Sequence, residues 1–289
     1  MFEITCTEEE QGLPPLQLLQ RRLPAAPASY LRHLLRRGKV CRQGELLAEG
    51  TPLAAGDSLQ LPASHRLQEL QRRGELTIVH EEGDFLVVDK PAGLAVHRGV
   101  GHEQDNLAGR LQELVARRGD PYRVAPVHRL DAETSGLVLF AKGRRAAATL
   151  GGLFMVGAVH KEYLALVSGQ LPATGELTTP VLAKGKWKEA ATEWQRLTSG
   201  SGFSLLQLRL HSGRTHQLRR QLAAAQHPVA GDSRYGGLLP PGLDRLFLHA
   251  HRLAFLHPCD QRPLQFTSPL PPPLEAVIGR LFPTWQRST

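Results

Sequence analysis

The segment HRLDAETSGLVLFAK (128–142) begins as a charged loop and ends as an apolar strand. Its last six residues, LVLFAK (137–142), are mostly apolar, and a short run of this kind predicts a buried strand. The carboxylate of Asp131 lies in the loop that precedes this strand. Since an acid at this position is usually a turn or cap residue, any other role for Asp131 depends on the rest of the chain.

The sequence around this segment predicts a domain that contains both strands and helices. Segments rich in apolar and β-branched residues predict further strands at TIVH (77–80), FLVVDK (85–90), EYLALV (162–167), FSLLQLRL (203–210) and LFLHAHRLAF (246–255). Helical stretches come between them at NLAGRLQELVARRG (106–119), RRAAATLGGLF (144–154) and RTHQLRRQLAAAQ (214–226). The irregular intervals argue against a regular parallel βαβ repeat. The expected fold class is α+β, with a central mixed, largely antiparallel sheet.

Length and composition limit the class of protein. The chain has 289 residues, of which 41% are hydrophobic, so it can bury a sizeable core. Its longest apolar runs are far shorter than the roughly 18 residues that a membrane-spanning helix needs, and its first ten residues carry acids where a targeting segment carries bases. The three cysteines are isolated, which predicts reduced thiols and no structural zinc site. We therefore expect a cytoplasmic protein with no membrane partner.

Positive charge is concentrated near the N-terminus of a chain whose net charge is +8. In ASYLRHLLRRGKV (28–40), the spacing of Leu31, Leu34 and Leu35 predicts a helix with one apolar face, and Gly38 fits a helix stop. The basic residues of the same segment are Arg32, Arg36, Arg37 and Lys39. Such a cluster attracts polyanions, although the face of a solvated helix has the same appearance.

The segment that follows predicts a small sheet with tight turns at QGE (43–45), EGT (49–51) and AGD (55–57), ending in the strand SLQL (58–61). Together with the helix before it, this order resembles an S4-type RNA-binding module over about residues 12 to 61. RQGEL stands where that pattern usually has a V-x-Asn-Gly turn. The resemblance implies that the four basic residues of the helix segment bind RNA.

Two polar or proline-rich stretches complete the domain organisation. The Arg- and Gln-rich stretch PASHRLQELQRRGE (62–75) predicts a linker between an S4-like α/β module at 1–61 and a larger domain at 76–289. We expect PLPPPL (269–274) to pack against the larger domain rather than to recruit a partner.

Four further segments of the larger domain carry polar residues at turns or strand faces. In VVDKPAGLAVHRG (87–99), the Lys-Pro-Ala-Gly turn predicts Lys90 and His97 in a loop rather than in the core. The strand KEYLALVSG (161–169) has Lys161 and Tyr163 on one face, since they are two residues apart. The other two segments are HSGRTHQLRRQL (211–222) and HPVAGDSRYGG (227–237).

With HRLDAETSGLVLFAK, these segments closely resemble, in this order along the domain, the RluA-type family of RNA pseudouridine synthases. The resemblance covers roughly residues 76 to 270, and HRLD-x-x-TSG and GRTHQLR are its most specific segments. It implies the pseudouridine synthase fold and the isomerisation of uridine to pseudouridine within structured RNA. The substrate expected first is ribosomal RNA of the large subunit, and transfer RNA is expected next. No cofactor or metal is expected, and the protein is expected to be a monomer.

The resemblance also assigns roles to residues of this chain. Asp131 would be the catalytic nucleophile, because a carboxylate can bond to the substrate or stabilise positive charge at C1′ and still leave. The family pairs its aspartate with an arginine, for which Arg219 is the candidate and Arg214 the alternative. Tyr163 would pack against the target base and relay a proton.

The remaining expected contacts of the domain are with the substrate RNA. Arg129 would contact a phosphate or fill the gap that a flipped-out base leaves, and Leu218 would line the pocket. Lys90 and Lys161 are candidate RNA-binding residues, and Arg214 is a candidate phosphate contact.

Other carboxylates and histidines offer alternative interpretations. Glu133 and Asp131 suggest a paired-carboxylate glycosidase, but adjacent loop acids rarely reach the opposed geometry that this chemistry needs. His249, His251 and His257 suggest a metal site, but no acid or cysteine cluster accompanies them, which favours packing and hydrogen bonding.

Two competing functions remain open at this point. A non-catalytic RNA-binding protein on the same fold would not need Asp131, Tyr163 and Arg219. A nucleosidase that cleaves glycosidic bonds would not need the basic N-terminal segment. Release of free uracil from RNA would support the nucleosidase, whereas isomerisation without release would exclude both.

Overall fold

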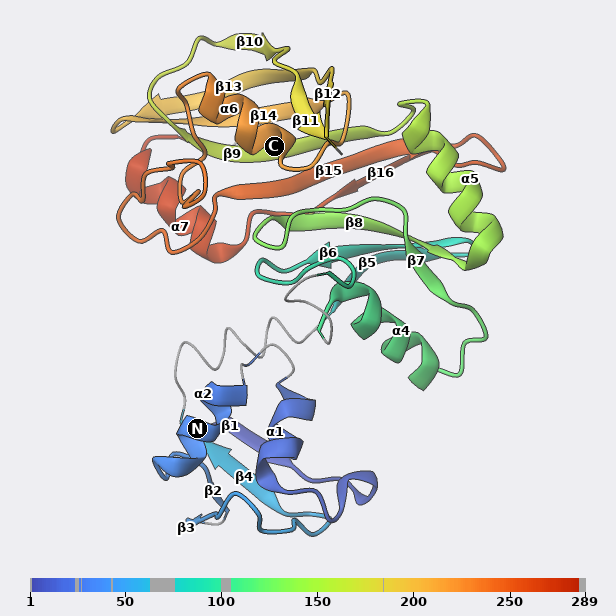
Figure 1. Ribbon diagram of the computed structural model, residues 1–289, viewed down its shortest axis with the longest axis vertical. Coiled ribbons are helices and arrows are strands. Elements are labelled where there is room, and N and C mark those ends of the chain that lie inside the picture. Colours follow the sequence, from blue (N-terminus) through green and yellow to red (C-terminus); the bar gives the residue numbers. More distant parts are fainter. Residues whose placement is uncertain are drawn as a thin grey trace. The chain divides into compact units, whose positions relative to one another are not determined.

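The structure is a computed structural model that describes residues 2–23, 26, 28–42, 44–62, 76–99, 105–183 and 185–285 (Figure 1). The chain divides into two compact units, Met1–Leu76 and Thr77–Thr289. Almost all of the predicted linker, residues 63–75, lies outside the described residues. The linker and the functions assigned to the two parts therefore stay predictions.

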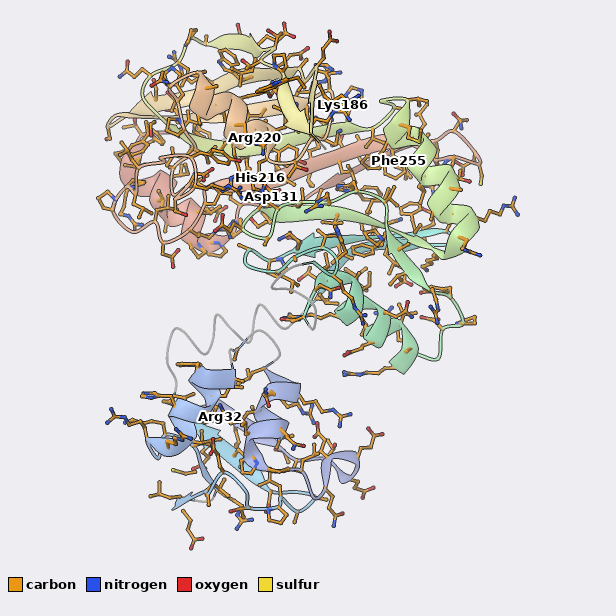
Figure 2. The ribbon with its side chains drawn as sticks, viewed as in Figure 1. Arg32, Asp131, Lys186, His216, Arg220 and Phe255 are labelled. Atoms are coloured by element: carbon orange, nitrogen blue, oxygen red, sulfur yellow. The ribbon has the colours of Figure 1, made fainter. Side chains whose placement is uncertain are left out.

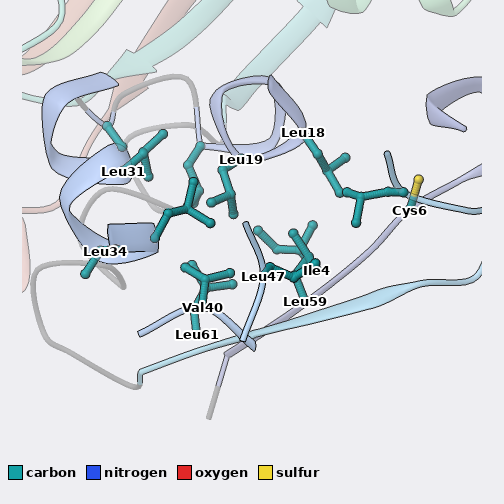
Figure 3. Close-up of a cluster of buried hydrophobic side chains, with 14 residues drawn as sticks. Ile4, Cys6, Leu18, Leu19, Leu31, Leu34, Val40, Leu47, Leu59 and Leu61 are labelled. Carbon is teal, nitrogen blue, oxygen red and sulfur yellow. The ribbon is translucent and has the colours of Figure 1, made fainter. Parts of the chain in front are cut away.

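The N-terminal unit combines two helices with a small antiparallel sheet in the order β1-β4-β2-β3. Its strands are β1 (Phe2–Thr5), β2 (Cys41–Arg42), β3 (Glu45–Leu46) and β4 (Ser58–Leu61), and its helical elements are η1 (Glu8–Glu10), α1 (Pro15–Arg22) and α2 (Ala28–Arg36). Leucines of both helices pack with strand residues such as Ile4 and Leu59 in one buried cluster (Figure 3). The unit therefore has a hydrophobic core of its own.

Helix α2 has the predicted apolar face. Leu31, Leu34 and Leu35 are buried in the cluster. At the end of the helix, Gly38 has φ 61°, and the backbone N–H groups of Gly38 and Lys39 donate to the carbonyls of Leu35 and Leu34. This pair of hydrogen bonds is the Schellman motif, in which glycine adopts the left-handed backbone conformation without the strain that a Cβ atom would cause.

The basic residues of this segment are all exposed. Arg32 Nε lies 3.0 Å from Glu49 Oε1, and Arg36 Nη2 lies 4.0 Å from Glu49 Oε2. One carboxylate therefore offsets part of the positive charge of the segment, and the proposal that it binds RNA remains to be tested.

The C-terminal unit is built on a ten-stranded sheet in the order β10-β13-β14-β9-β15-β8-β6-β5, in which β16 also pairs with β15 and β7 with β8. The strands are β5 (Thr77–Glu82), β6 (Phe85–Lys90), β7 (Val124–Pro126), β8 (Ser135–Lys142), β9 (His160–Ser168), β10 (Thr174–Leu177), β13 (Thr192–Gly200), β14 (Phe203–Leu210), β15 (Leu248–Leu256) and β16 (Pro263–Thr267). A separate hairpin contains β11 (Val181–Ala183) and β12 (Lys186–Lys188). The helices are α4 (Leu107–Arg117), α5 (Gly143–Met155), α6 (Gln217–Ala224) and α7 (Pro272–Leu281). The predicted mixed, largely antiparallel sheet is confirmed, since β8 and β15 form the one parallel pair among the described strands.

The helices cover different parts of this sheet. Figure 1 shows α5 and α7 at opposite ends of the unit. Helix α4 contacts β7, and helix α6 contacts β11. Leu274, Val277 and Ile278 of α7 pack in a buried cluster with residues of β9 and β14. The proline-rich segment 269–274 leads into α7, so it packs against the domain as predicted.

The two halves of the sheet meet where β8 begins. Strands β8 and β15 pair only through Ser135 and Gly136, which lie opposite His249 and Ala250. Gly136 has φ 114°, and a Cβ atom there would lie 2.3 Å from the carbonyl oxygen of Ala250. Only glycine fits this contact, so the junction fixes the loop that contains Asp131 just before it.

The start of α6 differs from the prediction. The helix begins at Gln217, three residues after the predicted Arg214. His216 has φ 52°, a left-handed conformation that interrupts helical geometry. Residues 214–216 therefore form a turn beside Asp131 rather than the first turn of the helix.

No helix in the described part of the chain is long and apolar enough to cross a membrane. The three cysteines form no disulfide in the structure: Cys6 is buried, Cys41 is half-buried and Cys259 is exposed.

Candidate active site

Asp131 lies beside two residues at the N-terminal end of α6. Its Oδ2 accepts a hydrogen bond of 3.4 Å from Nη1 of Arg219, and its Oδ1 lies 3.6 Å from Nε2 of His216. Figure 2 shows Asp131 and His216 close together near the middle of the C-terminal unit. The loop before β8 and the start of α6, which are far apart in the sequence, therefore meet at one carboxylate.

Arg219 binds a second aspartate more closely than it binds Asp131. Its Nε and Nη2 donate to Oδ2 and Oδ1 of Asp232 at 2.7 and 2.8 Å. The side chains of Asp232 and Arg219 are 0% and 4% exposed. Asp232 Oδ1 also accepts from the backbone N–H groups of Arg234 and Tyr235. This bidentate pair fixes the plane of the guanidinium and leaves Nη1 directed at Asp131.

Three carboxylates keep Arg219 charged. Burial alone would lower the pKa of its guanidinium, but Asp232, Asp131 and Glu133 together raise it above the ordinary value. The Glu133 carboxylate lies 3.4 Å from Arg219 Nη2 and is 53% exposed. Glu133 therefore adds negative charge at the rim of the site, and Arg219 rather than Arg214 is the arginine at ion-pair distance from Asp131.

His216 is held in one orientation by Tyr235. The Tyr235 hydroxyl lies 3.0 Å from His216 Nδ1 and accepts from Arg220 Nε at 3.1 Å. Because a guanidinium only donates, the hydroxyl proton of Tyr235 is available for Nδ1, which leaves the N–H of His216 on Nε2, facing Asp131. Burial, followed by the nearby arginines, lowers the pKa of His216 despite the opposing effect of Asp131, so the ring is neutral at pH 7.

Asp131, Tyr163 and Leu218 line one small pocket of about 60 Å³. Tyr163 lies on β9, and Leu218 lies on α6. Burial, with the charge of Asp131, raises the pKa of the Tyr163 phenol, so the phenol stays protonated at neutral pH. The pocket therefore brings together an ionisable carboxylate, a neutral hydroxyl and an apolar wall.

Two larger hollows adjoin this pocket. One of about 530 Å³ is also lined by Asp131, His97 and Arg219, and one of about 980 Å³ is also lined by Tyr163 and Lys161. Arg129 is exposed and lines all three spaces. Arg214 is exposed and lines the pocket and the larger hollow. Both arginines therefore lie where a polyanion bound in the pocket and the larger hollow would contact them.

Lys161 lies at the edge of the larger hollow. Its Nζ is 3.5 Å from the Ser212 carbonyl oxygen and 5.8 Å from the centre of the Phe154 ring. Burial lowers the pKa of its ammonium group.

The prediction that Lys90 lies in a loop and contacts RNA is wrong. Lys90 is the last residue of β6 and is 0% exposed. Its Nζ donates to the carbonyls of Pro91, Leu94 and Ala132 at 2.9, 2.7 and 2.9 Å. Burial, followed by repulsion from Arg245, lowers its pKa to about 7. Because Ala132 follows Asp131, Lys90 joins the Lys-Pro-Ala-Gly turn to the loop that contains Asp131.

Two histidines, the half-buried His128 and the buried His249, hydrogen-bond to residues of strand β8. His128 Nε2 accepts from the backbone N–H of Leu139, and burial, followed by repulsion from Lys161, lowers its pKa to about 3. His249 lies between Ser135 Oγ and the Ser268 carbonyl, at 3.0 and 3.1 Å. Among the residues that the structure describes, no group of three or more His, Cys, Asp or Glu side chains could hold a metal ion.

Asp232, His216 and Tyr235 were not predicted as site residues. Asp232 stands in HPVAGDSRYGG, a segment that shows several polar residues and glycines but not which of them is buried. The burial of Asp232 beside an arginine 13 residues earlier is visible only in the folded chain.

Known proteins resemble this chain over most of its length. A family model described as RNA pseudouridylate synthase matches residues 84–224. The ribosomal large subunit pseudouridine synthase C of Vibrio vulnificus is 31% identical over 291 residues, which cover 91% of this chain and 91% of that protein. The ribosomal large subunit pseudouridine synthase D of Xanthomonas campestris pv. campestris is 29% identical and covers 91% of this chain and 87% of that protein. The solved structure of human RNA pseudouridylate synthase domain containing 1 is 27% identical, with a TM-score of 0.58, and covers 71% of this chain and 88% of that one.

Proposed function

The chain belongs to the RluA-type family of RNA pseudouridine synthases, and we propose that it converts specific uridines of large-subunit ribosomal RNA to pseudouridine with Asp131 as nucleophile. Relatives named as ribosomal large subunit pseudouridine synthases support this choice of substrate over transfer RNA. The proposed enzyme acts in the cytoplasm as a monomer, without a cofactor or metal.

The observation that carries the proposal is the position of Asp131. Its carboxylate lines a pocket with Tyr163 and accepts a hydrogen bond from a buried, permanently charged Arg219. In the proposed reaction, the C1′–N1 bond of uridine breaks, the uracil turns within the pocket as a delocalised anion, and C5 bonds to C1′. The proton on C5 leaves and N1 gains one, so the product is an isomer of the substrate.

Each site residue has a role in this scheme. Asp131 bonds to the substrate or stabilises positive charge at C1′, and the hydrogen bond from Arg219 orients its carboxylate. Tyr163 packs against the base, and its protonated phenol relays a proton by accepting the one that leaves C5 while it gives its own to solvent, from which N1 is protonated. Leu218 forms an apolar wall, and Arg129 contacts a phosphate or fills the gap that the flipped-out uridine leaves.

Pseudouridine mapping of total RNA from a strain that lacks this chain tests the substrate. Large-subunit ribosomal RNA should lose pseudouridine at specific positions, and expression of the wild-type chain should restore them. Loss from transfer RNA alone would overturn the choice of substrate, and release of free uracil in vitro would overturn the reaction.

A further inference from the structure

The β11–β12 hairpin exposes a tryptophan between two lysines. Trp187 is 72% exposed, and Lys186 and Lys188 beside it are also exposed. Glu189 is the one acid between Thr179 and Ala190. A large aromatic ring left in water beside positive charge is typical of a surface that stacks on a base of a nucleic acid.

A hollow of about 270 Å³ separates this hairpin from α6. Its lining is mainly apolar and includes Pro180, Val181 and Trp187 from the hairpin and Arg220 and Ala224 from the helix. The hollow therefore offers an aromatic face and an apolar floor for a planar base, and a guanidinium for a phosphate.

Gln221 fixes the position of the hairpin against α6. Its side chain is fully buried, and its Nε2 donates to the carbonyls of Leu177, Thr179 and Ala190, which lie on both sides of the hairpin. Its Oε1 accepts a hydrogen bond of 2.8 Å from Thr192 Oγ1. Since buried polar networks of this kind restrict the geometry of a site, the hollow has a preformed shape.

The same helix connects this hollow to the pocket around Asp131. Leu218 and Arg219 line the pocket, and Arg220 and Ala224 line the hollow. Leu218 and Ala224 are six residues apart in the sequence, so they lie about 9 Å apart along the helix axis. In Figure 2, Arg220 is labelled between His216 and Lys186.

We propose that this hollow binds an unpaired nucleotide of the substrate RNA close to the target uridine. The base stacks on Trp187 and the adjoining phosphate binds Arg220. Lys186 and Lys188 alternate with Trp187 along β12, so they lie on the other face of the hairpin and attract the neighbouring backbone. The proposal rests on the proposed function for the identity of the RNA, but binding of single strands can be tested without it.

Fluorescence anisotropy with a labelled single-stranded 12-mer oligouridylate tests this site in the full chain. Trp187→Ala should weaken binding about tenfold and leave its salt dependence unchanged, because stacking on an aromatic ring is not ionic. Trp187→Phe should retain most of the affinity. The double change of Lys186 and Lys188 to Gln should reduce the slope of log K against log salt by about 1.4.

A matched control is Leu256→Ala, which removes another exposed apolar side chain that lines none of these hollows and should leave binding unchanged. Equal affinity of Trp187→Ala and wild type would overturn the proposal. So would a dimer of the wild-type chain that Trp187→Ala dissociates in sedimentation experiments, because the ring would then bind a second copy. Loss of affinity in Trp187→Ala with unaltered ribosomal pseudouridines in the deletion strain would overturn only the proposed substrate.

Discussion

Replacement of Asp232 by Asn should destabilise the C-terminal unit and inactivate the site together. The change removes the charge that faces Arg219 through bonds of 2.7 and 2.8 Å, and it leaves a buried guanidinium with the more distant Asp131 and Glu133. Loss of one partner of a buried ion pair costs about 3–5 kcal/mol of unfolding free energy. Displacement of Arg219 by about 1 Å relative to Asp131 should lower kcat about 100-fold.

Urea unfolding followed by tryptophan fluorescence measures the first effect. All three tryptophans, Trp187, Trp194 and Trp285, lie in the C-terminal unit, so the signal reports on that unit alone. Asp244→Asn, a change of an exposed aspartate in the same unit, should alter the unfolding free energy by no more than about 0.5 kcal/mol.

A double variant separates stability from activity. Arg219→Met with Asp232→Asn removes both charges, so it should recover most of the lost unfolding free energy and remain inactive, because Asp131 then has no guanidinium partner. A loss below about 1 kcal/mol in Asp232→Asn, or an active double variant, would refute the reasoning.

Three further predictions concern the independence of activity from metal ions, the role of the N-terminal unit and the pKa of Lys90. Activity should survive EDTA, because the proposed mechanism uses no metal, and a strict need for added zinc would contradict it. Deletion of residues 1 to 70 should raise the apparent KM for a large structured RNA and flatten the salt dependence of binding, with a much smaller change in kcat. If the affinity for RNA and its salt dependence are unchanged, the arginines of α2 belong to a solvated helix face and do not bind RNA. The folded pKa of Lys90, about 7, lies below its ordinary value, so the unfolded chain binds more protons and stability should rise with pH above 7. Relative to Lys90→Met, the wild type should gain about 2 kcal/mol of unfolding free energy between pH 7 and 9 in urea titrations, and no relative gain would show that the ammonium keeps its ordinary pKa.

The sequence predicted the central strands because their apolar runs are continuous. FLVVDK and FSLLQLRL form β6 and β14 with the predicted bounds, and both strands are mostly buried. Strand β13, TEWQRLTSG, was missed because it is polar and only partly buried. The β11–β12 hairpin was missed because its strands are only three residues long.

The candidate site was predictable where a residue belongs to a specific local segment, and less so where its environment comes from distant parts of the chain. Asp131 and Arg219 were named from HRLD and THQLR, and they lie together in the structure. Lys90 was misplaced because one of the carbonyls that its ammonium contacts, that of Ala132, is 42 residues away. Neither this contact nor the burial of Asp232 follows from local spacing.

The measurement that tests the central claim most directly is the activity of Asp131→Asn on large-subunit ribosomal RNA. The variant keeps the size of the side chain and removes the nucleophilic charge from the pocket. We predict no detectable pseudouridine, with RNA affinity within about tenfold of the wild type, because one carboxylate contributes little to binding a polyphosphate. Pseudouridine formation at more than about a few per cent of the wild-type rate would contradict the assignment of Asp131 as the nucleophile.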